Sequence, residues 1–260
     1  MSEIEPLLIA RDGPVLRLTL NRPERRNALT NDLISQLTTA LDEASADRTV
    51  GCVVLTGAGD RAFCAGADLT HGDTPFQFDF SEVHTPFANF LRAAKNCRAP
   101  IVGRVLGHCL AGGMGLYGAC DIVIAGESAR FGLPEAKVGI FPMQVLAVLR
   151  DVIPDRKLKE MCLTGHPLTA AEALQWGLVN SVVADADIDV EVDRVVASLA
   201  AVSPVAVRRG KYAMRVMETM SFDEMIAFSE TQVAPMTMTQ DAEEGRQAFK
   251  AKRAPVWPNR

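Results

Sequence analysis

The sequence predicts an α/β fold in which a core of alternating strands and helices precedes a helical C-terminal region. Short apolar runs typical of strands occur in the first half of the chain, separated by segments with helical periodicity. The last hundred residues show helical periodicity almost throughout. Of the 260 residues, 48% are hydrophobic, which is enough for a sizeable core.

The first half of the chain supports this prediction element by element. Residues 15–21 alternate apolar and polar side chains, as a half-buried strand does. A helix is expected over 31–46, with its apolar residues on one face and Asn31 as its N-cap. Another helix is expected to begin near Pro86, because proline is favoured in the first turn. Further short apolar strands are expected at residues 50–56, 101–106 and 122–125.

The second half is predominantly helical. One helix is expected to start at Thr169, whose hydroxyl can cap it, and to close at Gly177. A brief strand or extended link is expected at 178–183. The predicted helices cover residues 112–120, 145–152, 156–163, 168–176, 187–202, 204–220, 222–236 and 240–251.

Composition excludes several classes of protein. The net charge of -5 argues against a nucleic-acid-binding protein, which usually has a basic face. The six cysteines form no C-x-x-C pair and lie mostly in apolar runs, as free thiols do in a reducing compartment. The N-terminal residues lack a secretory pattern, and no apolar run reaches about 18 residues. We therefore expect a cytoplasmic protein without a membrane span, and the scattered histidines predict no metal site.

A glycine-rich stretch, residues 107–121, is the most informative local feature. The pair Gly112–Gly113 opens an apolar run that reads as a buried helix. The first N–H groups of a helix have no intrahelical acceptor, so this end can bind an oxygen that becomes negative during a reaction. The alternative is that the glycines only allow the helix to pack closely.

A second candidate donor lies in the segment that follows Phe63. If the two loops converge, the backbone N–H of Ala67 can meet that of Gly112, and two donors aimed at one oxygen form an oxyanion hole. Cys64 lies nearby, but only Arg61 is a cation close to it in sequence. A packed, unreactive thiol is therefore the expected role of Cys64.

Glu135 is the candidate acid or base. It follows Pro134 and lies among apolar residues, where an ionised carboxylate is disfavoured and its pKa rises towards the range useful for proton transfer. The alternative is a glutamate that only stabilises the start of a helix.

The most specific signal comes from six segments: RPERRNALT, RAFCAGADL, GHCLAGGMGLYGACDIVIA, ARFGLPEAKVGIFP, LTGHPLTAAEALQWGLVNSVV and EGRQAFKAKRAPVW. Together they resemble the enoyl-CoA hydratase/isomerase, or crotonase, family, and they occur in the family's order and spacing from about residue 14 to the end. The resemblance implies a crotonase-like spiral of ββα units over residues 1–200 and a helical trimerisation region over 201–260. It also implies a homotrimer or a dimer of trimers.

The resemblance also implies a ligand and a site. The family binds acyl-CoA thioesters, so coenzyme A enters as part of the substrate and no separate cofactor or metal is expected. Ala67 and Gly112 match the residues whose N–H groups bind the thioester carbonyl, and Glu135 matches a catalytic glutamate. The residues matching positions that border or bind CoA are Arg25, Ala28, Ala65, Asp68, Leu69 and Lys252. Arg25 also belongs to the cluster Arg22, Arg25 and Arg26, which is either an ordinary solvated loop or a seat for phosphate.

This chain departs from the hydratase pattern at one position. Family hydratases carry two glutamates that hold a water molecule, and the first of these is replaced here by Gly115. One carboxylate can move a proton between C2 and C4 of a 3-enoyl thioester, so isomerisation is favoured over hydration. Other chemistries of the family, such as hydrolysis and decarboxylation, and a catalytically silent acyl-CoA-binding protein remain alternatives. A dinucleotide-binding enzyme is disfavoured because the glycines lack G-x-G-x-x-G spacing.

Three further positions have open roles. Asp73 could approach a substrate as a second carboxylate, whereas His71 on the same loop is expected to be a surface residue. Met143 and Gln144 either shape the acyl pocket or only pack their helix.

Overall fold

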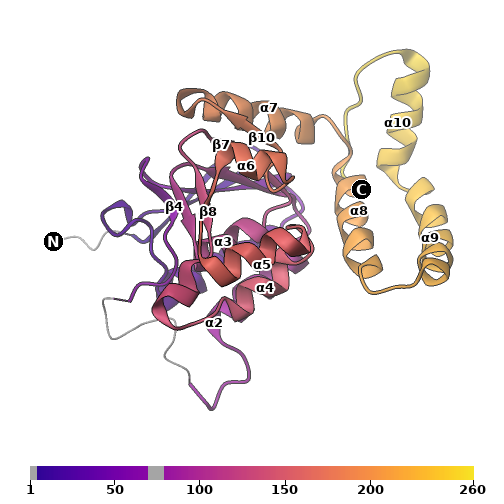
Figure 1. Ribbon diagram of the computed structural model, residues 1–260. Coiled ribbons are helices and arrows are strands. Elements are labelled where there is room, and N and C mark those ends of the chain that lie inside the picture. Colours follow the sequence, from indigo (N-terminus) through magenta and orange to yellow (C-terminus); the bar gives the residue numbers. More distant parts are fainter. Residues whose placement is uncertain (1–4, 70–78) are drawn as a thin grey trace.

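The computed structural model describes residues 5–69 and 79–260 and shows an α/β core with a helical C-terminal region beside it (Figure 1). His71 and Asp73 lie outside the described residues.

The larger sheet has six strands in the order β1-β2-β3-β5-β7-β10. β1 and β2 form an antiparallel hairpin, and the remaining neighbours are parallel. β3 has an almost continuous apolar sequence because helices cover both faces of a parallel sheet. The six strands are β1 (Leu7–Asp12), β2 (Val15–Leu20), β3 (Cys52–Gly57), β5 (Ile101–Val105), β7 (Ile122–Gly126) and β10 (Ser181–Val183).

A second, four-stranded sheet has the order β4-β6-β8-β9. β3, β5 and β7 of the larger sheet are each followed along the chain by one strand of the smaller sheet, and helical segments connect these pairs. This arrangement is the predicted spiral of ββα units. The strands of the smaller sheet are β4 (Ala62–Cys64), β6 (His108–Leu110), β8 (Arg130–Gly132) and β9 (Leu168–Thr169).

Helices cover the sheets close to where the sequence predicted them. The predicted N-cap of α1 was wrong: the cap is Thr30, whose hydroxyl accepts a hydrogen bond from Leu33 N at 3.2 Å. The start of α2 at Pro86 and the cap of α6 at Thr169 are confirmed. The core helices are α1 (Asn31–Ala46), α2 (Pro86–Asn96), α3 (Gly112–Gly118), α4 (Met143–Leu149), α5 (Asp155–Thr164), α6 (Ala170–Gln175) and α7 (Ile188–Ala200).

Two apolar cores hold these layers together. The main core lies between the two sheets and helices α1 to α6, and a smaller core lies between the other face of the larger sheet and α7. All six cysteines are free thiols, and five of them are buried, as predicted.

The C-terminal region comprises α8 (Pro204–Met217), α9 (Phe222–Thr237) and α10 (Gln240–Ala251), which stand to one side of the core (Figure 1). In the single chain neither α8 nor α9 has a buried residue. The domain boundary predicted at residue 201 stays a prediction. No helix among the described residues is both long and apolar enough to cross a bilayer.

Candidate active site

The loop that carries Ala67 packs directly against the start of α3. A Cβ built on Gly112 would lie 3.8 Å from Ala67 N, and a Cβ built on Gly66 would lie 3.3 Å from Gly112 N. Only backbones in direct contact give such distances. The backbone N–H groups of Ala67 and Gly112 therefore lie close together. This is the convergence of the two loops that a shared acceptor needs.

The orientation of both amides leaves them available to a ligand. Leu29 forms a parallel bridge with Ala67, in which Leu29 N donates to Gly66 O at 2.8 Å and Asp68 N donates to Leu29 O at 2.9 Å. In such a bridge the peptide groups of the central residue, here Ala67, point away from the partner strand. Gly112 is the first residue of α3, so its N–H has no intrahelical acceptor.

Ala111 sets the direction in which α3 begins. It has φ 50° and ψ −121°, a conformation that L-residues rarely adopt. The smaller sheet holds it there, because Ala111 N donates to Gly132 O at 2.9 Å. Close packing of the glycines is real as well, since a Cβ on Gly113 would overlap the carbonyl oxygen of Cys64. The glycine pair therefore allows the close packing that the sequence offered as one alternative, and it leaves the first N–H of α3 without an intrahelical acceptor.

A buried ion pair between Asp68 and Arg22 also holds the loop that carries Ala67. Asp68 is only 4% exposed, and its Oδ2 lies 2.7 Å from Arg22 Nη2. Arg22 also donates to the carbonyl oxygen of Ala28 at 2.5 Å. The structure therefore gives Asp68 a positioning contact within the protein. The sequence placed Arg22 in a basic cluster, but nothing in the sequence pairs it with Asp68.

Glu135 lies in the 3₁₀ helix Pro134–Val138, directly after β8, and is 7% exposed. Its Oε2 is buried and has no hydrogen-bond partner among the described residues. Burial raises the pKa of this carboxyl above its usual value of 4.5. The thiol of Cys162 on α5 lies close enough for Glu135 to add to the effect of burial, and together they raise the Cys162 pKa to about 11.

The same strand pairing brings Glu135 near the two amides. Leu110 of β6 pairs with Gly132 of β8, and Gly132 accepts the hydrogen bond from Ala111. Glu135 follows Gly132 by three residues, so their Cα atoms are at most about 11 Å apart. The backbone of Glu135 is therefore connected through β8 to the turn that begins α3.

An aromatic ring occupies the space beside Gly115, where the resemblance placed a missing glutamate. A Cβ built on Gly115 would lie 2.6 Å from Cζ of Phe87 on α2 and 3.5 Å from Cγ2 of Val145 on α4. A side chain at this position therefore requires Phe87 to move. Sequence reasoning missed Phe87, because no local pattern connects it with Gly115.

The remaining predicted residues lie in two separate regions. Arg25 and Leu69 are exposed and Ala28 is buried, while Ala65 N donates to Arg26 O at 3.0 Å. These positions all belong to the two segments joined around Ala67. Lys252 instead ends α10 in the C-terminal region, apart from β4 and the Ala67 loop in the single chain (Figure 1).

Cysteine and metal chemistry find no support among the described residues. Cys64 is fully buried, and burial raises the pKa of its thiol to about 12, so it is protonated at neutral pH. In residues 5–69 and 79–260, no three histidine, cysteine or acidic side chains gather as a metal site would require.

Comparison with known proteins places the chain in a family. The family profile described as Enoyl-CoA hydratase/isomerase matches residues 10–260. A protein of Dictyostelium discoideum named "Probable enoyl-CoA hydratase, mitochondrial" is 36% identical, with 95% of this chain and 89% of that protein covered. The Escherichia coli 2,3-dehydroadipyl-CoA hydratase is 35% identical over 98% of this chain and 99% of its own length.

Solved structures agree in fold. The crystal structure of an enoyl-CoA hydratase from Mycobacterium smegmatis matches with a TM-score of 0.91 and 32% identity, covering 98% of this chain and 99% of the other. An enoyl-CoA hydratase from Bacillus anthracis matches with a TM-score of 0.91 and 29% identity, covering 98% and 100%. The chain therefore belongs to the enoyl-CoA hydratase/isomerase family and has the crotonase fold.

Proposed function

We propose that this protein binds the thioester carbonyl of an acyl-CoA between the backbone N–H groups of Ala67 and Gly112. The convergence of these two amides is the observation that carries the proposal. In the reaction, negative charge moves from the α-carbon towards the thioester oxygen, and fixed donors stabilise that charge without reorganising. Loss of one such donor typically lowers kcat by about 10²–10³-fold.

Glu135 is the acid/base of this proposal. As a base, its ionised form removes a proton from C2 of a 3-enoyl thioester. As an acid, it returns the proton at C4, which moves the double bond to C2–C3. Its buried position favours the protonated form and so brings its pKa nearer to the operating pH.

Isomerisation is favoured over hydration because Gly115 stands where the resemblance places the first of the two hydratase glutamates. The ring of Phe87 fills the space beside Gly115, where a second carboxylate would start. Hydration is the second candidate, supported by the names of the similar proteins from Dictyostelium discoideum and Escherichia coli, which are both hydratases. Hydrolysis, decarboxylation and silent acyl-CoA binding follow, since they use the same amide pair.

The CoA part of the substrate lies along the two segments joined around Ala67. Arg25, Ala28, Ala65 and Leu69 border it in this proposal, and Asp68 holds their loop in place through Arg22. Lys252 reaches the 3′-phosphate of CoA from a neighbouring copy in a homotrimer or dimer of trimers. A cytoplasmic location stays a prediction.

The test is to assay the purified protein with 2-enoyl-CoA and 3-enoyl-CoA thioesters side by side. We expect conversion of 3-enoyl to 2-enoyl thioester, which falls by about 10²–10⁴-fold in Glu135→Gln. Fast water addition to 2-enoyl-CoA that Glu135→Gln abolishes would replace isomerisation by hydration. Tight thioester binding without turnover of any thioester would support the alternative of a catalytically silent acyl-CoA-binding protein.

A further inference from the structure

A basic cavity of about 790 Å³ lies between the C-terminal ends of α1 and α2 and the helices of the C-terminal region. Half of its sixteen lining residues are lysine or arginine, and none is aspartate or glutamate. The whole chain has a net charge of -5, so this concentration of positive charge is local.

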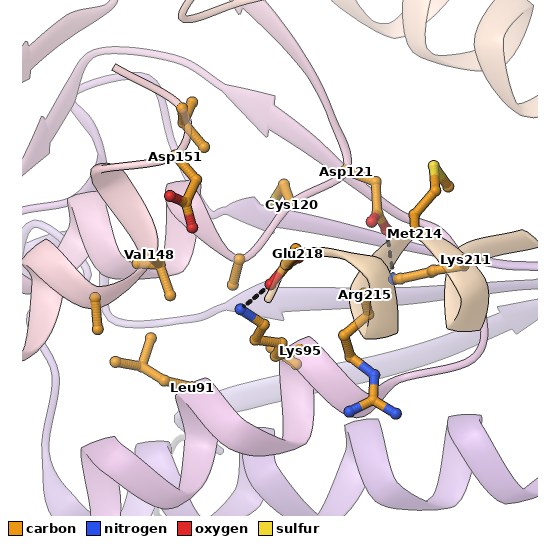
Figure 2. Close-up of a pocket in the computed structure, with 15 residues that line it drawn as sticks. Leu91, Lys95, Cys120, Asp121, Val148, Asp151, Lys211, Met214, Arg215 and Glu218 are labelled. Atoms are coloured by element: carbon orange, nitrogen blue, oxygen red, sulfur yellow. Dashed lines mark hydrogen bonds and ion pairs between the residues drawn. The ribbon is translucent and has the colours of Figure 1, made fainter. Parts of the chain in front are cut away.

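The two lysines of the cavity are already neutralised. Lys95 pairs with Glu218 at 2.5 Å and Lys211 pairs with Asp121 at 2.6 Å, which fastens α8 to the core. Figure 2 shows both pairs in the smaller cavity next to it, whereas the guanidinium of Arg215 points away from them. The lysines therefore hold the fold, and the arginines supply the positive charge of the basic cavity.

The arginines that line the cavity have no carboxylate partner within ion-pair distance among the described residues; they are Arg48, Arg98, Arg208, Arg209, Arg215 and Arg260. Arg208 donates instead to the carbonyl oxygen of Arg48 and to the side chain of Asn259. Arg209 donates a hydrogen bond through Nη2 to Gln232 Oε1 at 3.2 Å. Its Nε is buried and has no hydrogen-bond partner among the described residues.

These like charges lie close enough to oppose one another. Burial lowers the pKa of Arg208, and the nearby charges of Arg48 and Arg98 lower it further. Asp241 is the opposing acidic group, but its carboxylate already accepts hydrogen bonds from Ser203 and from the backbone N–H of Asn259. An anion from outside the chain would relieve this repulsion.

We propose that the cavity binds a small anion carrying two or more phosphate groups. Arginine is the side chain best suited to bind phosphate, because its planar guanidinium donates two parallel hydrogen bonds. Six guanidiniums without a carboxylate partner among the described residues carry more positive charge than one monophosphate or carboxylate neutralises. The volume falls within the range of about 300–1,000 Å³ typical of small-molecule sites.

This site is distinct from the proposed thioester site. Leu29, which bridges Ala67, lies just before the start of α1, whereas the cavity is lined by Ser45 and Arg48 at the other end. A helix of 16 residues is about 24 Å long, so the two sites lie at opposite ends of α1.

The test is calorimetric titration of the full chain with inorganic pyrophosphate and with tripolyphosphate. We expect saturable binding that Arg48→Gln combined with Arg98→Gln weakens at least about tenfold, because two charged donors are lost. The matched control, Arg92→Gln combined with Arg156→Gln, removes the same charge at exposed positions outside the cavity and should bind as the wild type does.

Pyrophosphate is also part of CoA, so the titration is repeated with CoA at saturation. Unchanged pyrophosphate binding under that condition supports a separate site. The proposal is overturned by loss of binding in the presence of CoA, by equal weakening in the control, or by a wild-type Kd above about 1 mM. A change in the mass of the oligomer in Arg48→Gln/Arg98→Gln would also overturn it, because the cavity would then be a contact between copies.

Discussion

Glu135 combines two properties at the scale of single residues: it is buried, and one of its carboxyl oxygens has no partner among the described residues. An unpaired buried carboxylate destabilises a fold, and natural proteins keep such groups mainly where function needs them. If Glu135 is the proposed acid/base, it is a position at which stability and activity oppose each other.

Substitution of Glu135 by glutamine should stabilise the fold in a pH-dependent way. The raised pKa means that the folded protein binds more protons here than the unfolded chain does. Wild-type stability from this group is therefore highest below 4.5, falls as pH rises from 4.5 to the raised pKa, and is constant above it. Thermal unfolding near pH 8 should show that Glu135→Gln is more stable than the wild type, because the wild-type carboxyl must ionise in a buried place or keep its proton at a cost.

Near pH 4 the two proteins should unfold alike, because the wild-type carboxyl is then neutral in both states. If the wild type and Glu135→Gln were equally stable near pH 8 as well, the prediction would be wrong, and the Glu135 carboxylate would have a hydrogen-bond partner in solution.

The close packing of the Phe87 ring against Gly115 gives a second prediction for single residues. Gly115→Ala places its Cβ 2.6 Å from Cζ of Phe87, so overpacking should destabilise the protein by about 1–3 kcal/mol. Phe87→Leu removes the colliding atom, so the double variant should be more stable than the sum of the single effects predicts. Urea unfolding of the four proteins measures this coupling.

Phe90→Leu is the matched control, because Phe90 stacks on Phe87 at a centroid distance of 6.0 Å but is not among the nearest neighbours of Gly115. Rescue of Gly115→Ala by Phe90→Leu as well would mean that the whole cluster relaxes, and the specific contact would be rejected.

The sequence could suggest only those candidate site residues whose signal is local. Glu135 lies among apolar neighbours, and Gly112 begins a glycine pair. Ala67 depends on a loop whose partner is unknown until the chain folds. Arg22 and Phe87 lack a signal altogether, because each acts through a contact with a residue far away in the chain.

At the scale of elements, the buried pair of Arg22 and Asp68 joins the Ala67 loop to the segment before α1. Asp68→Ala leaves the charge of Arg22 unpaired in a mostly buried place, which costs about 3 kcal/mol. A displaced loop also moves the Ala67 amide and the residues proposed to border CoA, so kcat should fall and the binding of CoA should weaken. Chemical unfolding and steady-state kinetics measure the two effects.

Asp193→Ala is the control for this experiment. Its pair with Arg17, at 2.8 Å, has an Asp193 side chain that is 63% exposed, so its loss should change stability little. If both variants behaved alike, the Arg22–Asp68 pair would have no special role in positioning the loop.

Elements were predictable in proportion to their length. The longer helices and the central strands of the larger sheet follow from apolar periodicity. The strands of the smaller sheet have two or three residues each, too few for any period, and their pairing comes from tertiary contacts. β1 was missed because its burial pattern has one buried residue and five exposed ones.

At the scale of the whole molecule, the C-terminal helices expose apolar side chains that a single chain does not cover. Phe222 is 71% exposed and Val233 is 61% exposed, both on α9. Exposed apolar surface is typical of association sites, and most soluble oligomers are closed symmetric assemblies. We expect the wild type to be a trimer or a multiple of three, and Phe222→Asp with Val233→Asp to reduce its mass in light scattering.

Val190→Asp is the corresponding control, since Val190 is 72% exposed but lies on α7, outside that region. If the wild type were a monomer, or if Val190→Asp dissociated the assembly equally, the claim that α9 mediates association would be rejected.

The most direct measurement is a crystal structure of the protein with an unreactive saturated acyl-CoA bound. The account predicts that the thioester oxygen lies about 2.7–3.1 Å from the backbone nitrogens of both Ala67 and Gly112, with the Glu135 carboxyl facing C2. A thioester oxygen bound elsewhere, or a Glu135 side chain turned away from the acyl chain, would contradict it.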